Sequence, residues 1–408
     1  MHDLRAITTS GLFIVVLACT MLPLDCGHIS TARAQILELP RADSSRGDFF
    51  GTSVAISGRR ILVGATGEDA CGTNSGAAYV YEQTDDGWAR AAYLMPSDCE
   101  AGRLFGRSVA LSGDVAVVAA SQEFFSRETP NIVYVFEPDS AGTWHETGKL
   151  SGGSASEEGP FGTSVSVHDE QILVTTAGNS TQGTRRNRSG AAYVFSRSAD
   201  GAWVKSDRFT SASTRFGIFG TSGAIHGSHA VVSASTYFQH RPGSVYFFAL
   251  DDESSRWEQT SRFGGIDDFF ISVDMSERRA IVGESKAGSS ETGAATIFDL
   301  DESGEWVESQ SIRLGRPYDH GAFGTDVAID GDYALIAAYD EQLGLDINVD
   351  RVVYVFKRSA SGAWKQHQVI DVGEVAFGAS LDVDGGYAVI GSAADDEPGA
   401  VYVVQLVE

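Results

Sequence analysis

Acidic pairs are the residues of this sequence whose type and spacing could bind a ligand. They recur at the start of segments that have the composition of loops: Glu68-Asp69, Asp340-Glu341 and Asp395-Asp396, the last followed by Glu397. Neighbouring loops that bring such carboxylates together could bind a cation or a basic ligand. Solvated loop charge, which keeps a protein soluble, explains the same pattern and is the simpler interpretation. Both interpretations stay open at this stage.

Serines also recur, and a serine can act as a nucleophile. They are Ser53, Ser108, Ser164, Ser222, Ser272 and Ser380. A residue that returns at one position of most repeats is predicted to be structural. The sequence has no G-x-S-x-G elbow, no H-E-x-x-H helix and no phosphate-binding glycine loop. We therefore expect no enzyme and no catalytic residue from linear motifs.

The N-terminus has the features of an export signal. Residues 11–24 form an apolar run that is too short to span a bilayer and is broken by Pro23. Arg5 precedes the run, and Ala32-Arg33-Ala34 follows it as an A-x-A cleavage pattern. We predict a signal peptide over residues 1–34, with the protein secreted or held at the cell surface or in the periplasm of a bacterium. The alternative is an outer-membrane lipoprotein attached at Cys19, because residues 16–19 resemble a lipoprotein box.

Cleavage after Ala34 leaves two cysteines, Cys71 and Cys99. An even pair in an oxidising compartment predicts one disulfide bond. Two free buried thiols are the alternative. In the repeat pattern described below, both cysteines fall on the same end of the fold, which favours the bond.

Charge excludes two classes of partner. The chain has 408 residues, with 30 Lys and Arg against 55 Asp and Glu, for a net charge of −25. A surface this acidic repels nucleic acid backbones and anionic headgroups. We expect neither nucleic acid nor peripheral membrane binding, and no transmembrane span in the mature chain.

One sequence motif is repeated seven times along the chain. Phe50-Gly-Thr-Ser-Val is the first copy, and the later copies begin near residues 105, 161, 219, 269, 323 and 377, at intervals of 50 to 58 residues. After each start, two short strands meet at a tight turn, a third strand carries a tyrosine (Thr296 in the fifth copy), and a tryptophan opens a fourth strand. Four antiparallel strands per repeat predict an all-β, seven-bladed β-propeller.

The two ends of the repeat array predict how the ring closes. The last copy stops at its third strand, near Val401–Val404, without a tryptophan. A short apolar segment that includes Ile36 precedes the first copy, and it has the pattern of an isolated fourth strand. Joined, these segments complete the seventh blade, which removes open sheet edges. The propeller is predicted to span residues 35–408.

The Phe-Gly-x-Ser-Val openings, Val63-Gly-Ala and Gly76-Ala-Ala-Tyr-Val-Tyr resemble FG-GAP repeats. The chain is similar to the seven-repeat propellers of integrin alpha subunits and to secreted bacterial FG-GAP proteins. This resemblance implies extracellular adhesion or ligand binding by the loops of one face. The calcium loops of integrin-type repeats are absent from the hairpins, so no cofactor or metal site is expected; calcium bound elsewhere is the alternative that stays open. Arg46-Gly47-Asp48 spells an adhesion tripeptide, but its place before a Phe-Gly marks it as part of the repeat.

Loop lengths indicate where a ligand would bind. The connections between strands two and three and between blades are long, and they gather on one face of the propeller, here called the long-loop face. We predict a non-enzymatic binding or adhesion module that recognises a protein or glycan ligand through this face. Two alternatives stay open: an enzyme acting on extracellular polysaccharide with acids from different blades around the central channel, and a structural component of the cell envelope.

Overall fold

Short apolar segments fold this chain into antiparallel strands that pair in groups of four. The second and third strands of a blade are buried on both faces, whereas the fourth strands alternate buried and exposed residues. In the computed structural model, residues Arg33–Glu408 form one compact unit. The structure describes residues 35–40, 47–120, 131–152, 160–177, 190–210, 217–236, 243–251, 253–266, 271–285, 293–314, 322–340, 350–374, 376–394 and 398–406.

The strands form seven four-stranded sheets, or blades, in chain order. Blades 1 to 3 consist of β2 (Phe50–Ser57), β3 (Arg60–Ala65), β4 (Ala77–Thr84) and β5 (Gly87–Leu94); β6 (Phe105–Ser112), β7 (Val115–Ala120), β8 (Ile132–Pro138) and β9 (Trp144–Leu150); β10 (Phe161–His168), β11 (Gln171–Thr176), β12 (Ala191–Arg197) and β13 (Trp203–Phe209). Blades 4 and 5 consist of β14 (Gly217–His226), β15 (His229–Thr236), β16 (Gly243–Asp251) and β17 (Arg256–Ile266); β18 (Ile271–Ser276), β19 (Arg279–Glu284), β20 (Ala294–Leu300) and β21 (Trp306–Ile312). Blades 6 and 7 consist of β22 (Val327–Asp330), β23 (Tyr333–Asp340), β24 (Asp350–Arg358) and β25 (Trp364–Ile370); β26 (Phe377–Asp384), β27 (Tyr387–Ser392), β28 (Ala400–Gln405) and β1 (Ile36–Glu38).

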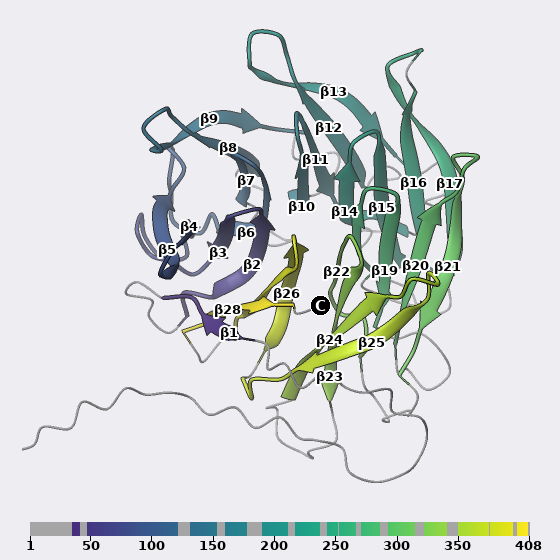
Figure 1. Ribbon diagram of the computed structural model, residues 1–408. Helices are drawn as coiled ribbons and strands as arrows, with labels where there is room; N and C mark the ends of the chain where they lie inside the picture. Colours follow the sequence, from purple (N-terminus) through teal and green to yellow (C-terminus); the bar gives the residue numbers. More distant parts are fainter. Residues whose placement is uncertain are drawn as a thin grey trace, which may run out of the picture. The chain divides into compact units, whose positions relative to one another are not determined.

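The first strand of each blade lies innermost. Figure 1 shows β2, β6, β10, β14, β22 and β26 around a common central space. No helix occurs in the described part of the chain, and therefore none that could cross a membrane. The predicted all-β, seven-bladed propeller with four antiparallel strands per blade is confirmed.

Blade 7 is built from both ends of the described chain, as predicted. Strand β1 pairs antiparallel with β28, with Ile36 opposite Val404 and Glu38 opposite Tyr402. The Leu39 amide donates to the Val401 carbonyl at 2.8 Å, and the Leu39 side chain is only 1% exposed. This short segment therefore closes the ring.

The Phe-Gly pair that opens each repeat has a packing role. In six blades the phenylalanine ring meets the repeat tyrosine edge-on, with ring centroids 5.4 to 5.6 Å apart. In blade 1 these rings belong to Phe50 and Tyr79. The glycine that follows, Gly51, has φ +90°, and a Cβ there would lie 2.6 Å from the Ala400 carbonyl oxygen of blade 7. Only glycine fits this conformation and this close approach.

The core is divided among the interfaces between adjacent blades, here called seams. Seven clusters of buried apolar side chains occur in the described residues, one in each seam. In blades 1 to 6, the tryptophan at the start of the fourth strand packs toward the preceding blade; Trp88 of blade 1, for example, meets Tyr387 of blade 7 edge-on. A single blade cannot bury both faces of its sheet, so each blade depends on its neighbours.

Candidate functional site

One of the three predicted acidic loops lies within the described residues. Glu68 and Asp69 follow β3 in blade 1. Asp340 is the last residue of β23 and pairs with Asp350 of β24, but its side chain is outside the described part. Glu341, Asp395, Asp396 and the alternative lipid-attachment residue Cys19 also lie outside the described residues. The geometry of the long-loop face can therefore be built from blade 1.

The blade 1 loop is joined to the connection that leads into blade 2. Cys71 and Cys99 form the predicted disulfide bond, with Cα atoms 5.9 Å apart. Next to it, the Gly102 amide donates to the Thr73 carbonyl at 2.8 Å. Two connections that are distant in the sequence are thus held as one surface, which confirms that both lie at the same end of the propeller.

Hydrogen bonds within the loop hold its acidic residues in place. The Ser75 hydroxyl donates to the Glu68 carbonyl at 2.9 Å and accepts from the Cys71 amide at 3.1 Å. The Asp69 carboxylate accepts the Asn74 amide at 2.8 Å. A loop ordered before binding loses less conformational entropy when a partner arrives.

The Glu68 carboxyl lies among groups that change its chemistry. The Tyr93 hydroxyl lies 3.4 Å from Glu68 Oε1, and the Tyr79 hydroxyl also bonds this carboxyl. Burial, together with the nearby negative charge of Asp48, raises the pKa of Glu68. Burial and the Glu68 charge also raise the pKa of Tyr93 to about 12, so its hydroxyl stays protonated and can donate.

Two apolar side chains are exposed beside these acids. Tyr93 and Met95 are each 38% exposed. Tyrosine and methionine are enriched in protein interfaces because they offer a large contact area. We call Glu68, Asp69, Tyr93 and Met95 the blade-1 patch.

Asp48 of the adhesion-like tripeptide is not available to a receptor. Its side chain is 6% exposed, and its carbonyl accepts the Gly67 amide at 3.0 Å. Gly67 itself approaches so closely that a Cβ there would lie 1.7 Å from the Gly47 carbonyl oxygen. Gly47 and Asp48 are thus packed against the blade 1 loop. This packing agrees with the interpretation of the tripeptide as part of the repeat rather than as an adhesion site.

A second candidate site is the central channel. It has a volume of about 410 Å³ and is lined by the innermost strands of all seven blades. Its carboxylates come from three consecutive blades and are Asp274, Asp326, Asp330, Asp382 and Asp384. Blades 1 to 4 contribute serines, aliphatic residues and the histidines His168 and His226. No lysine or arginine is among the described lining residues.

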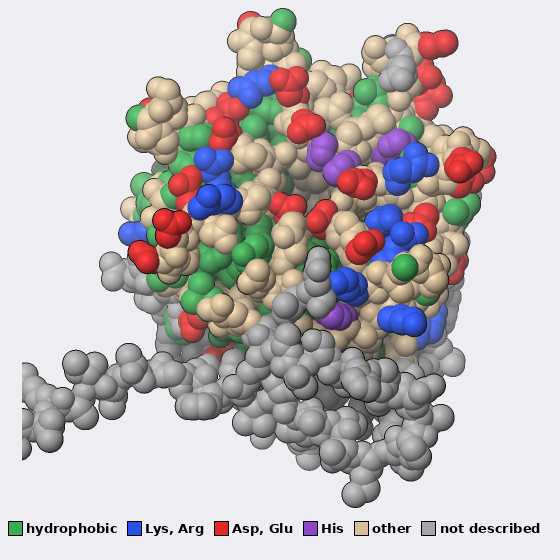
Figure 2. All heavy atoms as spheres, viewed as in Figure 1, with side chains coloured by type: hydrophobic (Ala, Val, Ile, Leu, Met, Phe, Trp, Pro, Cys, Tyr) green, Lys and Arg blue, Asp and Glu red, His purple; other side chains and the backbone are tan. Residues whose placement is uncertain are grey.

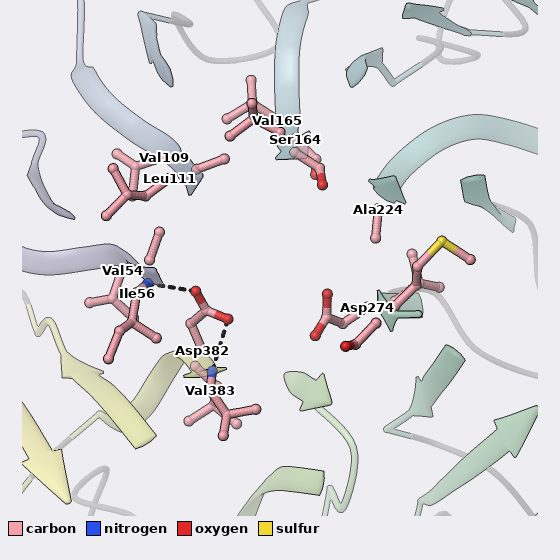
Figure 3. A pocket seen from close by; sticks show the side chains of 18 of the residues that line it. Val54, Ile56, Val109, Leu111, Ser164, Val165, Ala224, Asp274, Asp382 and Val383 are labelled. Carbon is pink, nitrogen blue, oxygen red and sulfur yellow. Dashed lines mark hydrogen bonds between the residues drawn. The ribbon is translucent and has the colours of Figure 1, made fainter. Parts of the chain in front are cut away.

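Two figures show this arrangement. Asp274 and Asp382 project into the channel from facing sides (Figure 3). On the face seen in Figure 2, acidic side chains and histidines lie around the centre of the propeller, with Lys and Arg side chains among them. The channel therefore has an acidic side, formed by blades 5 to 7, and a serine side, formed by blades 1 to 4.

Each seam is crossed by a hydrogen bond inside the channel, here called a seam bond. A side-chain oxygen on one innermost strand accepts a backbone N–H from the innermost strand of the next blade. On the serine side the acceptors are hydroxyls, and the bonds run from Val109 to Ser53, Val165 to Ser108, Ile225 to Ser166 and Val273 to Ser222, at 2.9 to 3.2 Å. On the acidic side they are carboxylates, and the bonds run from Ile329 to Asp274, Leu381 to Asp326 and Ile56 to Asp382, at 2.7 to 2.9 Å.

Hydrogen bonds across the seams explain the recurring serines. Ser53, Ser108 and Ser222 occupy the same repeat position, and each ties its blade to the next. Ser164, Ser272 and Ser380 donate to the next blade rather than accept from it. These serines are structural, as the sequence indicated.

The channel aspartates were not singled out in the sequence, although an alignment of the repeats reveals them. Asp326 stands at the position of Ser53. Asp274 and Asp382 stand two residues later in their repeats, at the position of Ser166.

The enclosed carboxyls on the acidic side hold protons more tightly than usual. Burial raises the pKa of Asp274 to about 7 and that of Asp326 to about 6, and it raises the pKa of Asp382 well above its ordinary value. Repulsion between the carboxylates adds to the effect for Asp274 and Asp382, while hydrogen bonds from backbone amides oppose it. A carboxyl that titrates near neutral pH is suited to general acid–base chemistry.

The described residues contain no group of three side chains arranged to hold a metal ion. His168 and His226 lie face to face, with ring centroids 3.8 Å apart. His168 Nδ1 accepts the Gly227 amide at 3.2 Å, so this ring also ties two blades together. Burial, and then His168, lower the pKa of His226.

Similarity to known proteins supports the fold. A family model described as FG-GAP repeat matches residues 35–81 and 88–136. The periplasmic gluconolactonase of Pseudomonas aeruginosa aligns with a TM-score of 0.52 at 13% identity, over 85% of this chain and 96% of that one. A putative 6-phosphogluconolactonase from Bacteroides uniformis aligns with a TM-score of 0.53 at 12% identity, over 81% and 88%. Identities this low establish a shared fold and no shared activity. No curated protein sequence matches the chain.

Proposed function

We propose that this chain, an FG-GAP repeat protein whose seven repeats form one propeller, is an exported, non-enzymatic module that binds a protein or glycan ligand through its long-loop face. The observation that carries the proposal is the blade-1 patch. The exposed Tyr93 meets the carboxyl of Glu68, the exposed Met95 follows two residues later, and a disulfide and backbone hydrogen bonds join the loops at this place. The disulfide suits an oxidising compartment outside the cytoplasm.

The chemistry of the blade-1 patch favours a basic ligand. Tyr93 offers a ring face and a hydroxyl, and Glu68 and Asp69 place carboxylates beside it. A lysine, an arginine or an amino sugar combines positive charge with apolar atoms and matches these groups.

Binding of the oxidised protein to arrays of proteins and glycans tests the proposal. Tyr93→Ala should weaken binding of a retained ligand by about tenfold or more, because exposed tyrosines often dominate interface energies. The pair Glu68→Gln and Asp69→Asn should reduce binding and its dependence on salt. Asp85→Asn is the matched control, since Asp85 lies in the tight β4–β5 turn. A ligand bound equally by all variants, or no retained ligand, would contradict the proposal.

A second candidate function is supported by the channel. The facing carboxyls of Asp274 and Asp382 have raised pKa values, the property expected of an acid–base enzyme with acids from different blades. The seam bonds weigh against it, because they already engage these carboxyls and give them a structural role. Screening for hydrolysis or lysis of polysaccharides and lactones tests this candidate. Turnover that Asp274→Asn abolishes would favour the enzyme over the binding module.

A further inference from the structure

Comparing seams within the channel separates the structural role of a seam bond from the effect of the charge on its acceptor. A seam bond needs only an oxygen that accepts a backbone N–H. Ser166, Asp274 and Asp382 occupy the same position of their repeats. The Ser166 hydroxyl accepts the Ile225 amide at 3.1 Å. The Asp274 and Asp382 carboxylates accept the amides of Ile329 and Ile56, both at 2.7 Å. Because an uncharged serine suffices at one seam, the charges of Asp274 and Asp382 exceed what the bond requires.

The surplus charge is concentrated where the ring closes. The three carboxylate seam bonds join blade 5 to 6, blade 6 to 7 and blade 7 to 1. Blade 7 depends for its outer strand on β1, whose three residues pair with β28. Repulsion among these carboxylates therefore acts on the closing seams of the propeller.

The groups that face these carboxyls supply hydrogen bonds and further acids. Strands β18, β22 and β26 add Asp330 and Asp384. Two serines of β18 donate across the seam, Ser272 to Asp326 at 2.7 Å and Ser276 to Asp330 at 2.9 Å. Strands β10 and β14 bring His168 and His226, and the β10–β11 and β18–β19 turns bring Asp169 and Glu277 near His226. The lining parts of β2 and β6 are serines and aliphatic residues. No described lining residue is a lysine or an arginine.

We propose that Asp274, Asp326 and Asp382 form a proton-controlled latch. When the carboxyls are protonated, the latch holds the three seams 5–6, 6–7 and 7–1 tight, and when the carboxyls ionise, it loosens these seams. The device lies in the ring itself, so it does not depend on any ligand of the blade-1 patch. It makes the closure of the propeller tightest in mildly acidic surroundings.

The direction of the pH dependence follows from the titration of these groups. An aspartate in the unfolded chain has a pKa near 3.8, whereas Asp274 in the folded chain has a pKa of about 7. Between these values the folded state retains a proton that the unfolded state has released. The stability of the folded state therefore falls as the pH rises from about 4 to about 7 and levels off above that range.

Thermal unfolding between pH 5 and pH 8, with EDTA present so that no divalent cation neutralises the acids, tests the latch. The melting temperature of the wild type should fall by roughly 5 °C across this range. Asp274→Ser and Asp382→Ser should each reduce that fall and raise the melting temperature at pH 8. Asp85→Ser, in an exposed turn, removes one charge outside the channel and should leave the slope unchanged. An unchanged slope in both channel variants would overturn the proposal.

Hydrogen exchange of the wild type provides a second measurement that requires no variant to fold. After correction for intrinsic exchange rates, amides of β1, β26 and β28 should exchange several-fold faster at pH 8 than at pH 5. Amides of β6 and β10, on the serine side, should not change. A uniform change across all blades would assign the effect to the net charge of the molecule and would overturn the latch.

Discussion

The serine side and the acidic side of the channel perform the same structural task with different chemistry. On both sides, an innermost strand accepts a backbone N–H from the next blade. The serine side uses neutral hydroxyls, and its first two blades are further connected through the Cys71–Cys99 bond. The acidic side uses carboxylates and contains the noncovalent closure by β1.

This difference shows how a repeat protein can vary charge without changing its fold. The bond geometry is retained at every seam, while the cost of burying a charge is confined to three of them. Costly groups that the fold does not require are typical of functional positions. The serine side therefore serves as a reference for what the acidic side adds.

Removing residues 36–39 should have the largest effect. The ring would open on the acidic side, losing the β1 pairing and the buried Leu39 side chain. We expect a loss of about 5 kcal/mol or more in unfolding free energy, since Leu39→Ala alone should cost about 3 kcal/mol. Chemical denaturation measures this loss. Leu37→Ala is the control, because Leu37 is 40% exposed and its truncation should cost under about 0.5 kcal/mol. A deletion as mild as this control would refute closure by β1.

The double variant Cys71→Ser with Cys99→Ser weakens the serine side instead. Loss of a cross-link between residues 28 apart should reduce the unfolding free energy by about 3 kcal/mol, because the unfolded chain gains freedom. Denaturation of the variant and of the reduced wild type should agree. If neither differs from the oxidised protein, the bond has no role in stability.

Ser166→Asp transfers the chemistry of the acidic side to the serine side. The new carboxylate can accept the Ile225 amide but adds a buried charge, so we expect a loss of about 2 kcal/mol at pH 8 and a smaller loss at pH 5. Ser166→Ala should lose about 1 kcal/mol at both pH values, since it removes the seam bond without adding charge. Equal losses for Ser166→Asp at the two pH values would show that the sides do not differ electrostatically.

Glu68→Gln should have the smallest effect on stability. Burial and Asp48 raise the pKa of Glu68, so its ionisation slightly destabilises the fold as the pH rises above about 4.5. Because the carboxyl is partly exposed, we expect a gain within about 0.5 kcal/mol at pH 8 and none at pH 4. Melting curves of the variant and the wild type at both pH values measure it. A gain at pH 4 as well would assign the change to packing.

Much of the architecture could be predicted because the same pattern recurs seven times, so each repeat confirms the strand assignment made in the others. The Phe-Gly openings, the tyrosine of the third strand and the tryptophan of the fourth recur at fixed places, and they identified the blades. The closing strand at Ile36 and the disulfide followed from the same register.

The candidate sites were predicted only in part. Glu68 and Asp69 were identified, but the neighbours that alter Glu68, namely Asp48, Tyr79 and Tyr93, come from separate strands and connections. Asp274 and Asp382 are more than a hundred residues apart in the chain, and no linear motif joins them. The hydrophobic pattern of the sequence shows which residues form strands. The interactions between charges depend on distances in the folded structure, which the sequence does not reveal.

The sequence by itself determined the number of blades, the strands within them and the partner of the N-terminal segment, because these depend on local periodicity repeated seven times. Only the tertiary structure decided that three aspartates from three blades line one channel whose described lining contains no lysine or arginine, and that a buried Asp48 lies beside Glu68. The reason is physical: burial and the distance between charges are properties of the closed ring, and no single repeat contains them.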